Sequence, residues 1–391
     1  MRIIRACREL GIACAAVYSE ADSESLHLKW ADEKICIGPP PGGKSYLDQE
    51  RILRAAQQSG ADAVHPGYGY LAENGDFAEK CETQGIAFIG PTPACLRLTG
   101  DKLAAKQAMQ AAGVPVVPSS EAAATSIDEA GAFADQVGYP VMIKASAGGG
   151  GRGIRICSDA ESLPEEFAIA RAEARAAFGN QEIYLEKYLS SPRHIEFQVL
   201  ADTFGNTIHL GERECTVQRR FQKLIEESPS PALSPELRQR IGEAAVRAMR
   251  AVGYRNAGTV EFLLDREKRF YFIEINSRIQ VEHPVTELVT GIDLVKEQIR
   301  LAAGEQLGYT STEVAFRGSA IECRINAEDP ERNFLPCPGR VERYHAPSGP
   351  GVRIDTHLHQ GYELPVYYDS LLAKLIAYAA DRRTALAVMR R

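Results

Sequence analysis

The chain has 391 residues, a formal net charge of −7 at pH 7 and a sequence pI near 5.8. This length predicts two or three domains with a large buried core, and the acidic balance argues against nucleic acid as the main partner. The sequence has no run of about 18 apolar residues and no charged start followed by an apolar stretch, so we expect neither a membrane span nor a signal peptide. Its nine cysteines are scattered without a C-x-x-C motif, which indicates reduced thiols in a cytosol-like compartment.

The first hundred residues alternate between helix and strand patterns. Residues 2–10 carry their apolar side chains on one helical face, and Gly11 is a typical helix stop. Strands are expected at 12–18, 34–37 and 61–65, with a helix near 48–59. This rhythm predicts a doubly wound parallel sheet, although such a unit normally opens with a strand and this chain opens in a helix.

Two glycine-rich stretches match nucleotide-binding patterns by letter alone. Residues 38–45 fit the P-loop pattern G-x-x-x-x-G-K-S, but the three prolines at 39–41 have no N–H to offer a phosphate. Residues 148–153 fit the dinucleotide pattern G-x-G-x-x-G, which a helix should follow. Because the residues that follow have the pattern of a strand, we expect neither match to be a true site of its kind.

A phosphate-binding hairpin is nevertheless predicted around the second stretch. Strands are expected at 139–145 and 153–157, and a glycine-rich tip between them would bring backbone N–H groups onto a phosphate. Lys144 would add a positive charge at the strand end. The alternative is a mobile surface loop. Lys102, at a helix start, is a weaker candidate for phosphate, and the strand at 182–189 could hydrogen-bond an adenine.

The segment 270–282 alternates polar and apolar residues with period two, which predicts a half-buried strand. If 266–269 is the four-residue loop of a hairpin, Glu261 on the preceding strand lies opposite Glu274. Two facing carboxylates repel each other, so we expect a hard cation such as Mg²⁺ or Mn²⁺ between them. Asn276, one pleat on, would add a neutral oxygen ligand, and Arg278 and Glu282 are expected to continue the same face away from the metal.

Six motifs are spread along nearly the whole chain: Lys144 with GGGGRG, EKYL at 186–189, QRRFQK at 218–223, EINSRIQVEHP at 274–284, HPGYGY at 65–70 and ECRINAED at 322–329. Together they resemble biotin carboxylase, the ATP-grasp component of acetyl-CoA carboxylase and its relatives. The resemblance implies an N-terminal Rossmann-like domain at 1–98 and an ATP-grasp domain at 99–308 with a mobile lid at about 116–188. It also implies a mixed C-terminal domain at 318–391. Relative to the family, the first strand and the end of the last domain are missing.

The family's roles carry over to matching residues. ATP would be contacted by Lys102, Lys144, Gly150, Gly151, Glu186, Lys187, Tyr188, Leu189, His194 and Gln218. Glu261, Glu274 and Asn276 would hold Mg²⁺ or Mn²⁺ in two sites. Bicarbonate and biotin would be held by Lys223, Arg278, the backbone of Val281 and Arg324, with Glu282 as the general base. Phe221 stands where the family often has a histidine near the ribose, so we assign no contact to it.

The implied function is carboxylation of biotin on a carrier protein, with ATP and bicarbonate and through carboxyphosphate, as the first half-reaction of acetyl-CoA carboxylase in fatty acid synthesis. Expected partners are the biotin carboxyl carrier protein, a carboxyltransferase component and a second copy in a homodimer, with neither nucleic acid nor a membrane. The expected compartment is the cytoplasm, or a plastid stroma or mitochondrial matrix. Alternatives are the biotin carboxylase portion of another acyl-CoA or pyruvate carboxylase, another ATP-grasp ligase, and a non-catalytic interaction subunit.

Overall fold

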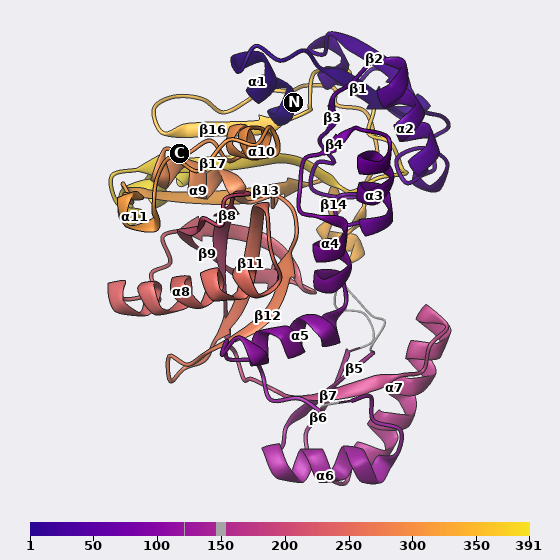
Figure 1. Ribbon diagram of the computed structural model, residues 1–391, viewed down its shortest axis with the longest axis vertical. Coiled ribbons are helices and arrows are strands. Elements are labelled where there is room, and N and C mark those ends of the chain that lie inside the picture. Colours follow the sequence, from indigo (N-terminus) through magenta and orange to yellow (C-terminus); the bar gives the residue numbers. More distant parts are fainter. Residues whose placement is uncertain (121, 146–153) are drawn as a thin grey trace.

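The computed structural model describes residues 1–120, 122–145 and 154–391, and it separates into an N-terminal α/β unit, a large sheet and a lid (Figure 1). In the view of Figure 1 most of the N-terminal unit lies at the upper right, the large sheet lies to its left and below it, and the lid lies at the bottom. Within the described residues, no helix has the length and apolar character needed to cross a membrane.

The N-terminal unit follows the predicted alternation of helices and strands. Its elements are α1 (Arg2–Glu9), β1 (Ala15–Tyr18), β2 (Glu33–Cys36), α2 (Gln49–Gln58), β3 (Ala63–Val64), α3 (Gly75–Thr83), β4 (Ala87–Phe88) and α4 (Pro93–Gly100). Strands β1 and β2 pair in parallel, and so do β3 and β4, as expected for a doubly wound sheet. The predicted stop of α1 is confirmed: Gly11 has φ +73°, and the N–H of Ile12 donates to the carbonyl of Cys7 at 2.8 Å.

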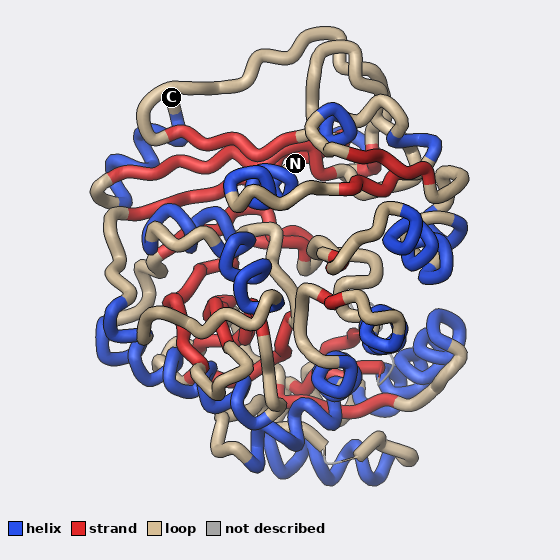
Figure 2. The backbone as a smooth tube through the Cα atoms, turned by 45° about the horizontal axis from the view of Figure 1, so that its top comes forward, coloured by secondary structure: helices blue, strands red, loops and turns tan. Residues whose placement is uncertain are grey.

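Eight antiparallel strands form the large sheet, in the order β12-β11-β8-β9-β10-β13-β17-β16. Their bounds are β8 (Arg193–Ala201), β9 (Thr207–Arg219), β10 (Gln222–Ser228), β11 (Asn256–Leu264), β12 (Phe270–Asn276), β13 (Ser319–Asn326), β16 (Val352–Thr356) and β17 (Leu371–Ala379). Figure 2 shows these strands lying beside one another, with helices bordering them. The β10–β13 pairing joins the predicted ATP-grasp and C-terminal regions in one sheet, so side chains of both regions meet on its face.

Helices cover both faces of this sheet and build its cores. They are α5 (Lys102–Ala111), α8 (Pro235–Ala251), α9 (His283–Thr290), α10 (Leu294–Ala302) and, near the end of the chain, α11 (Arg382–Arg390). Helix α8 packs Ile241, Ala245 and Met249 against Phe197 and Phe262, which are all buried. On the other face, α10 packs against α1. Rigid packing of this kind fixes the strands that carry the polar side chains described below.

The lid is a small sandwich with its own buried core. Its elements are α6 (Ile127–Val137), β5 (Val141–Ala145), β6 (Ile154–Cys157), α7 (Leu163–Phe178) and β7 (Ile183–Lys187), with the strands in the antiparallel order β6-β5-β7. Val141, Ile143 and Leu185 are fully buried in this core. The predicted hairpin of β5 and β6 is confirmed by their pairing. Its tip, with Gly150 and Gly151, lies outside the described residues.

The remaining elements are short. They are the 3₁₀ turns at Glu20–Asp22, Leu26–Lys29, Gly42–Lys44, Ser311–Glu313 and Pro330–Arg332, and the two-residue pair of β14 (Glu328–Asp329) with β15 (Leu335–Pro336).

Candidate active site

The facing carboxylates predicted for the β11–β12 hairpin are present. Glu261 and Glu274 are direct partners in the antiparallel register. The predicted loop is wrong by one residue, because five residues separate Leu264 from Phe270 rather than four. A register shift, in which Ile273 is the extra residue of a bulge, restores the pairing and lets both Phe272 and Ile275 reach the core.

The predicted strand at 270–282 is wrong beyond Asn276, where β12 ends. The N–H of Ser277 donates to the side chain of Glu73 at 2.9 Å, and its hydroxyl bonds that of Thr99 at 2.7 Å. These contacts draw the chain out of the sheet toward α4. Glu282 therefore does not continue the face of Glu274 along a strand, but occupies the residue just before α9, makes no capping hydrogen bond with its side chain and is fully buried.

Lys223 on β10 is the centre of the site. Its Nζ contacts a carboxylate oxygen of Glu196 on β8, and it lies 2.7 Å from oxygens of both Glu261 and Glu282. Burial alone would lower the pKa of Lys223, but these three carboxylates hold it well above its ordinary value. A permanent cation thus joins three separate segments of the chain.

Glu282 is held between two cations. It accepts from Nζ of Lys223 and, at 2.9 Å, from Nη2 of Arg324 on β13. Burial would raise the pKa of Glu282, yet Lys223 together with Arg324 lowers it, so the side chain is a carboxylate at neutral pH. Arg324 also donates from Nε to Glu226 at 2.6 Å. A buried carboxylate in this state can accept a proton from a bound substrate.

Arg278 lies beside this cluster in another set of contacts. Its Nε is 3.1 Å from Oε2 of Glu73, and its Nη2 donates to Oδ1 of Asn276 at 3.2 Å. The carbonyl of Val281 accepts a hydrogen bond from Lys374 at 2.6 Å. Both groups are therefore occupied by side chains of this chain in the structure.

The carboxylate pair fits a divalent cation. Burial together with Glu261 raises the pKa of Glu274, while Lys102, at 3.7 Å, and the more distant Lys223 oppose the rise. Asn276 is close enough to donate from Nδ2 to Glu261 at 2.9 Å. Two carboxylates and an amide oxygen are ligands of the type that Mg²⁺ and Mn²⁺ prefer. A depression lined by Glu73, Lys102, Glu274 and Asn276 gives access to this set.

Predicted ATP residues fall into two groups. His194 joins the metal pair, with Nε2 at 3.0 Å from Glu261 and Nδ1 at 3.1 Å from the side-chain amide of Gln218. In the lid, Lys144 contacts Glu186 on β7, and Lys106 on α5 contacts the same carboxylate from the body of the protein.

The end of β7 is held to the lid by its own hydrogen bonds. Lys187 donates from Nζ to the carbonyl of Gly138 at 2.7 Å, and the N–H of Tyr188 donates to Pro140 at 3.2 Å. Leu189, just beyond β7, is half-buried.

Several polar residues of this site were not predicted from the sequence. They are Glu73, Lys106, Glu196, Arg213 and Glu226. Arg213 is fully buried and contacts Glu196, while its Nη1 donates to Gln198 at 2.8 Å. The available signal was a charged residue between apolar neighbours in a strand, as with Glu196 between Ile195 and Phe197 in RHIEFQVLA. Such a residue is almost always paired when it is buried.

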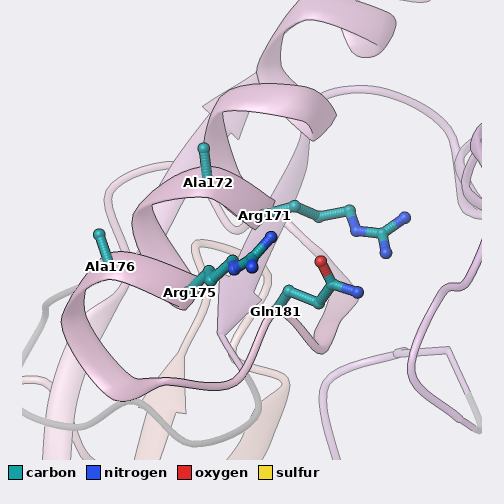
Figure 3. Close-up of a pocket in the computed structure, with 5 residues that line it drawn as sticks. All are labelled: Arg171, Ala172, Arg175, Ala176 and Gln181. Carbon is teal, nitrogen blue, oxygen red and sulfur yellow. The ribbon is translucent and has the colours of Figure 1, made fainter.

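A second surface depression lies on the lid, away from these residues. Figure 3 shows that it is lined by Arg171, Ala172, Arg175, Ala176 and Gln181. Arg171 donates to the carbonyl of Thr125 at 3.1 Å. None of the predicted site residues lines this depression, so we do not assign the reaction to it.

The predicted difference between the two glycine-rich lysines can be tested by mutation. Lys44 follows a turn in which its own N–H donates to Pro41 at 2.8 Å and that of Ser45 to Gly42 at 3.1 Å, so these donors are used internally. Lys44→Ala should leave ATP affinity unchanged in a titration, whereas Lys144→Ala should weaken it clearly. A tenfold loss for Lys44→Ala, about 1.4 kcal/mol, would restore the P-loop interpretation.

A carboxylate-bearing antiparallel sheet, together with a separate lid whose hairpin carries a lysine, defines the ATP-grasp class of enzymes. The family model "Carbamoyl-phosphate synthase L chain, ATP binding domain" matches residues 101–310. The models "Biotin carboxylase, N-terminal domain" and "Biotin carboxylase C-terminal domain" match residues 1–96 and 322–391. The chain belongs to the biotin carboxylase family.

Similar proteins agree with this assignment over the full chain. Biotin carboxylase of Nostoc sp. is 56% identical over 391 residues, which are 100% of this chain and 88% of that protein. A solved complex of Campylobacter jejuni biotin carboxylase with beta-gamma-ATP has a TM-score of 0.95 at 48% identity, covering 100% of this chain and 87% of the other. The biotin carboxylase domain dimer of Hydrogenobacter thermophilus 2-oxoglutarate carboxylase, solved with MgADP, ADP and bicarbonate, has a TM-score of 0.94 at 52% identity, covering 100% and 86%.

Proposed function

We propose that this chain uses ATP to carboxylate biotin with bicarbonate. The observation that carries the proposal is the convergence of Lys223, Glu282 and Arg324 beside the carboxylate pair of the β11–β12 hairpin. An ATP-grasp enzyme that catalyses a different ligation would need a phosphate site and a metal site, but it would not need a buried base held between a lysine and an arginine.

Bicarbonate is a poor nucleophile, and ATP converts it to carboxyphosphate. Lys223 and Arg278 would hold the bicarbonate anion by charge. Glu282 would take the proton of bicarbonate while an oxygen of bicarbonate attacks the γ-phosphorus of ATP. ADP leaves as the new phosphorus–oxygen bond forms. In the structure the three N–H donors of Lys223 go to Glu196, Glu261 and Glu282, so a bicarbonate at Nζ would take the place of one of these carboxylates and would lie next to the base.

ATP would be bound between the lid and the hairpin. Lys144 and Lys102 would contact its phosphates, residues 186–189 its adenine, and His194 with Gln218 the region between them. Glu261, Glu274 and Asn276 would hold Mg²⁺ or Mn²⁺, which when bound offsets the charge of the phosphates.

The second half of the reaction transfers the carboxyl group. Carboxyphosphate breaks down to CO₂ and phosphate, and the phosphate removes the proton from the ureido nitrogen of biotin. Arg324 would stabilise the negative charge that develops on the ureido oxygen, as an oxyanion hole does. The nitrogen then attacks CO₂ and carboxybiotin forms.

We further propose that the biotin belongs to a carrier protein, that the enzyme is a homodimer, and that it serves acetyl-CoA carboxylase. Support comes from relatives named biotin carboxylase that match the whole chain. The matched biotin carboxylase domain dimer of 2-oxoglutarate carboxylase supports a second candidate, service to another carboxylase.

The proposed reaction is tested by ADP release from the purified chain. Release should rise when bicarbonate is added and rise further with free biotin. ADP release that is indifferent to bicarbonate would favour a different ATP-grasp ligase, and the absence of any ATP cleavage would favour a non-catalytic subunit. Supplying the carrier with either carboxyltransferase then distinguishes acetyl-CoA from 2-oxoglutarate as the final acceptor.

A further inference from the structure

Two buried glutamates face each other beneath Arg324. Glu226 on β10 and Glu322 on β13 are direct partners in the antiparallel register, and both are 0% exposed. Side chains at such positions lie on the same face of the sheet with their Cβ atoms close together. Only one of their four oxygens, Oε1 of Glu226, has a hydrogen-bond donor among the described residues, which is Nε of Arg324.

Charged groups surround Glu322 without contacting it. Arg324 on the same strand is taken by Glu226 and Glu282. Lys374 on β17 donates to the carbonyl of Val281 at 2.6 Å and lies 3.8 Å from Asp355. The carboxylates of Glu226 and Glu282 and the hydroxyl of Tyr68 are also near enough to interact with its charge. An ionised Glu322 would therefore be a buried charge without a partner, which is strongly unfavourable.

The pKa values of the two side chains agree with the geometry. Burial raises the pKa of Glu322 well above its usual range, and Glu226 and Glu282 add to the rise against Lys374 and Arg324. Burial, together with Glu282, raises the pKa of Glu226 to about 7. Because Glu226 has a cation partner and Glu322 has none, the proton that two facing carboxyls retain belongs on Glu322.

We propose that Glu322 stays protonated in the working enzyme, so that the Glu226–Glu322 pair carries a single negative charge, on Glu226, which holds Arg324 against Glu282. The two glutamates are positioning residues, and the inference rests on the proposed role of Arg324. A negative charge on Glu322 of β13 would draw the guanidinium of Arg324 toward the two glutamates and away from Glu282. Loss of the charge on Glu226 would leave Arg324 tethered at one end only.

Three isosteric variants test this proposal: Glu322→Gln, Glu226→Gln and, as a matched control, Glu227→Gln. Glu227 is the next residue on β10, and it pairs with Arg382 instead of with the site. The control Glu227→Gln should have the same kcat for carboxybiotin formation and the same KM for ATP as the wild type. Glu226→Gln should lower kcat for carboxybiotin formation by up to about 100-fold, the effect of a misplaced catalytic group, with little change in KM for ATP.

Glu322→Gln should lower kcat far less than Glu226→Gln does at pH 7, because an amide resembles a protonated carboxyl. Its rate should also persist at alkaline pH, where the wild type declines as Glu322 ionises. Infrared spectroscopy offers a readout that does not depend on activity. The wild type should show the C=O band of a buried protonated carboxyl that Glu322→Gln lacks and that disappears from the wild type as the pH rises.

The proposal is overturned if the wild type has no such band, or if Glu322→Gln keeps the same alkaline decline as the wild type. It is also overturned if Glu322→Gln loses as much activity as Glu226→Gln, since Glu322 would then act as an anion. If Glu322→Gln does not fold, the pH titration of the infrared C=O band of the wild type decides whether a buried carboxyl is protonated. If the wild type forms no carboxybiotin, the proposed function fails, whereas the infrared band still decides where the proton lies.

Discussion

Glu282→Gln should abolish carboxybiotin formation and bicarbonate-dependent ADP release together. Glu282 is the proposed base for bicarbonate, and without it no carboxyphosphate forms. Glutamine keeps the volume of this buried side chain. Lys223 retains Glu196 and Glu261 as partners and Arg324 retains Glu226, so the fold should survive.

Arg324→Ala should behave differently, because its proposed partner is a charge that develops later. It should lose about 10²–10³ in the rate of carboxybiotin formation, the usual effect of removing one transition-state donor. It should retain more of its slow bicarbonate-dependent ATP cleavage than of biotin carboxylation.

Both variants are assayed by following ADP and carboxybiotin in the same reaction, with free biotin as the acceptor. Glu227→Gln, which removes a charge outside the site, is the control and should leave both products unchanged. If Arg324→Ala depresses both products equally while Glu282→Gln spares ATP cleavage, the division of roles between the two residues is wrong.

Glu261→Gln and Glu274→Gln should both raise the Mg²⁺ requirement or abolish turnover, but they should change the stability of the metal-free protein in opposite directions. Glu261 is buried and contacts Lys223 and His194, whereas the ion pair of Glu274 among the described residues is a longer one, with Lys102 at 3.7 Å. Removing the charge of Glu261 loses its favourable interactions with Lys223 and His194 and should destabilise the fold. Removing that of Glu274 relieves repulsion between the two carboxylates.

The pH dependence of stability separates the two cases. Although burial opposes it, Lys223 with His194 lowers the pKa of Glu261 in the folded state, so its charge stabilises the fold above the unfolded pKa and this stability is lost in acid. Burial with Glu261 raises the pKa of Glu274, so the fold is relatively favoured while Glu274 is protonated and loses that advantage as the pH rises.

Thermal unfolding in a chelator should therefore show Glu261→Gln below the wild type at neutral pH, with the deficit shrinking in acid. Glu274→Gln should lie at or above the wild type at neutral pH, with the gain shrinking in acid. If both variants keep a normal Mg²⁺ dependence of turnover, these two residues are not the metal ligands.

The sequence was informative where the contacts are local. The β11–β12 hairpin brings Glu261 opposite Glu274 because the two strands are neighbours in the chain. The sequence predicted a loop that is one residue too short and no bulge at Ile273. These two errors cancel, so the predicted pairing of Glu261 with Glu274 is still correct. Pattern alone could not find the bulge, since its cause is the fit of Phe272 and Ile275 into the core.

Contacts between distant segments were less accessible. The period-two pattern persists past Asn276, yet the chain leaves the sheet because Glu73 and Thr99, far back in the sequence, bind Ser277. The same limit applies to β10 and β13, whose pairing puts Lys223 and Arg324 on one sheet. The resemblance to a family named those two residues, but the packing that orients them had to be seen in the structure.

The central claim is that this chain fixes bicarbonate onto biotin at the expense of ATP, and labelled bicarbonate tests it most directly. The chain is incubated with ATP, Mg²⁺, free biotin and isotopically labelled bicarbonate, and acid-labile label on biotin is counted. We predict label that requires ATP and is absent with Glu282→Gln. Bicarbonate-stimulated ADP release without any label on biotin, from free biotin or from a biotinylated carrier, would contradict the account.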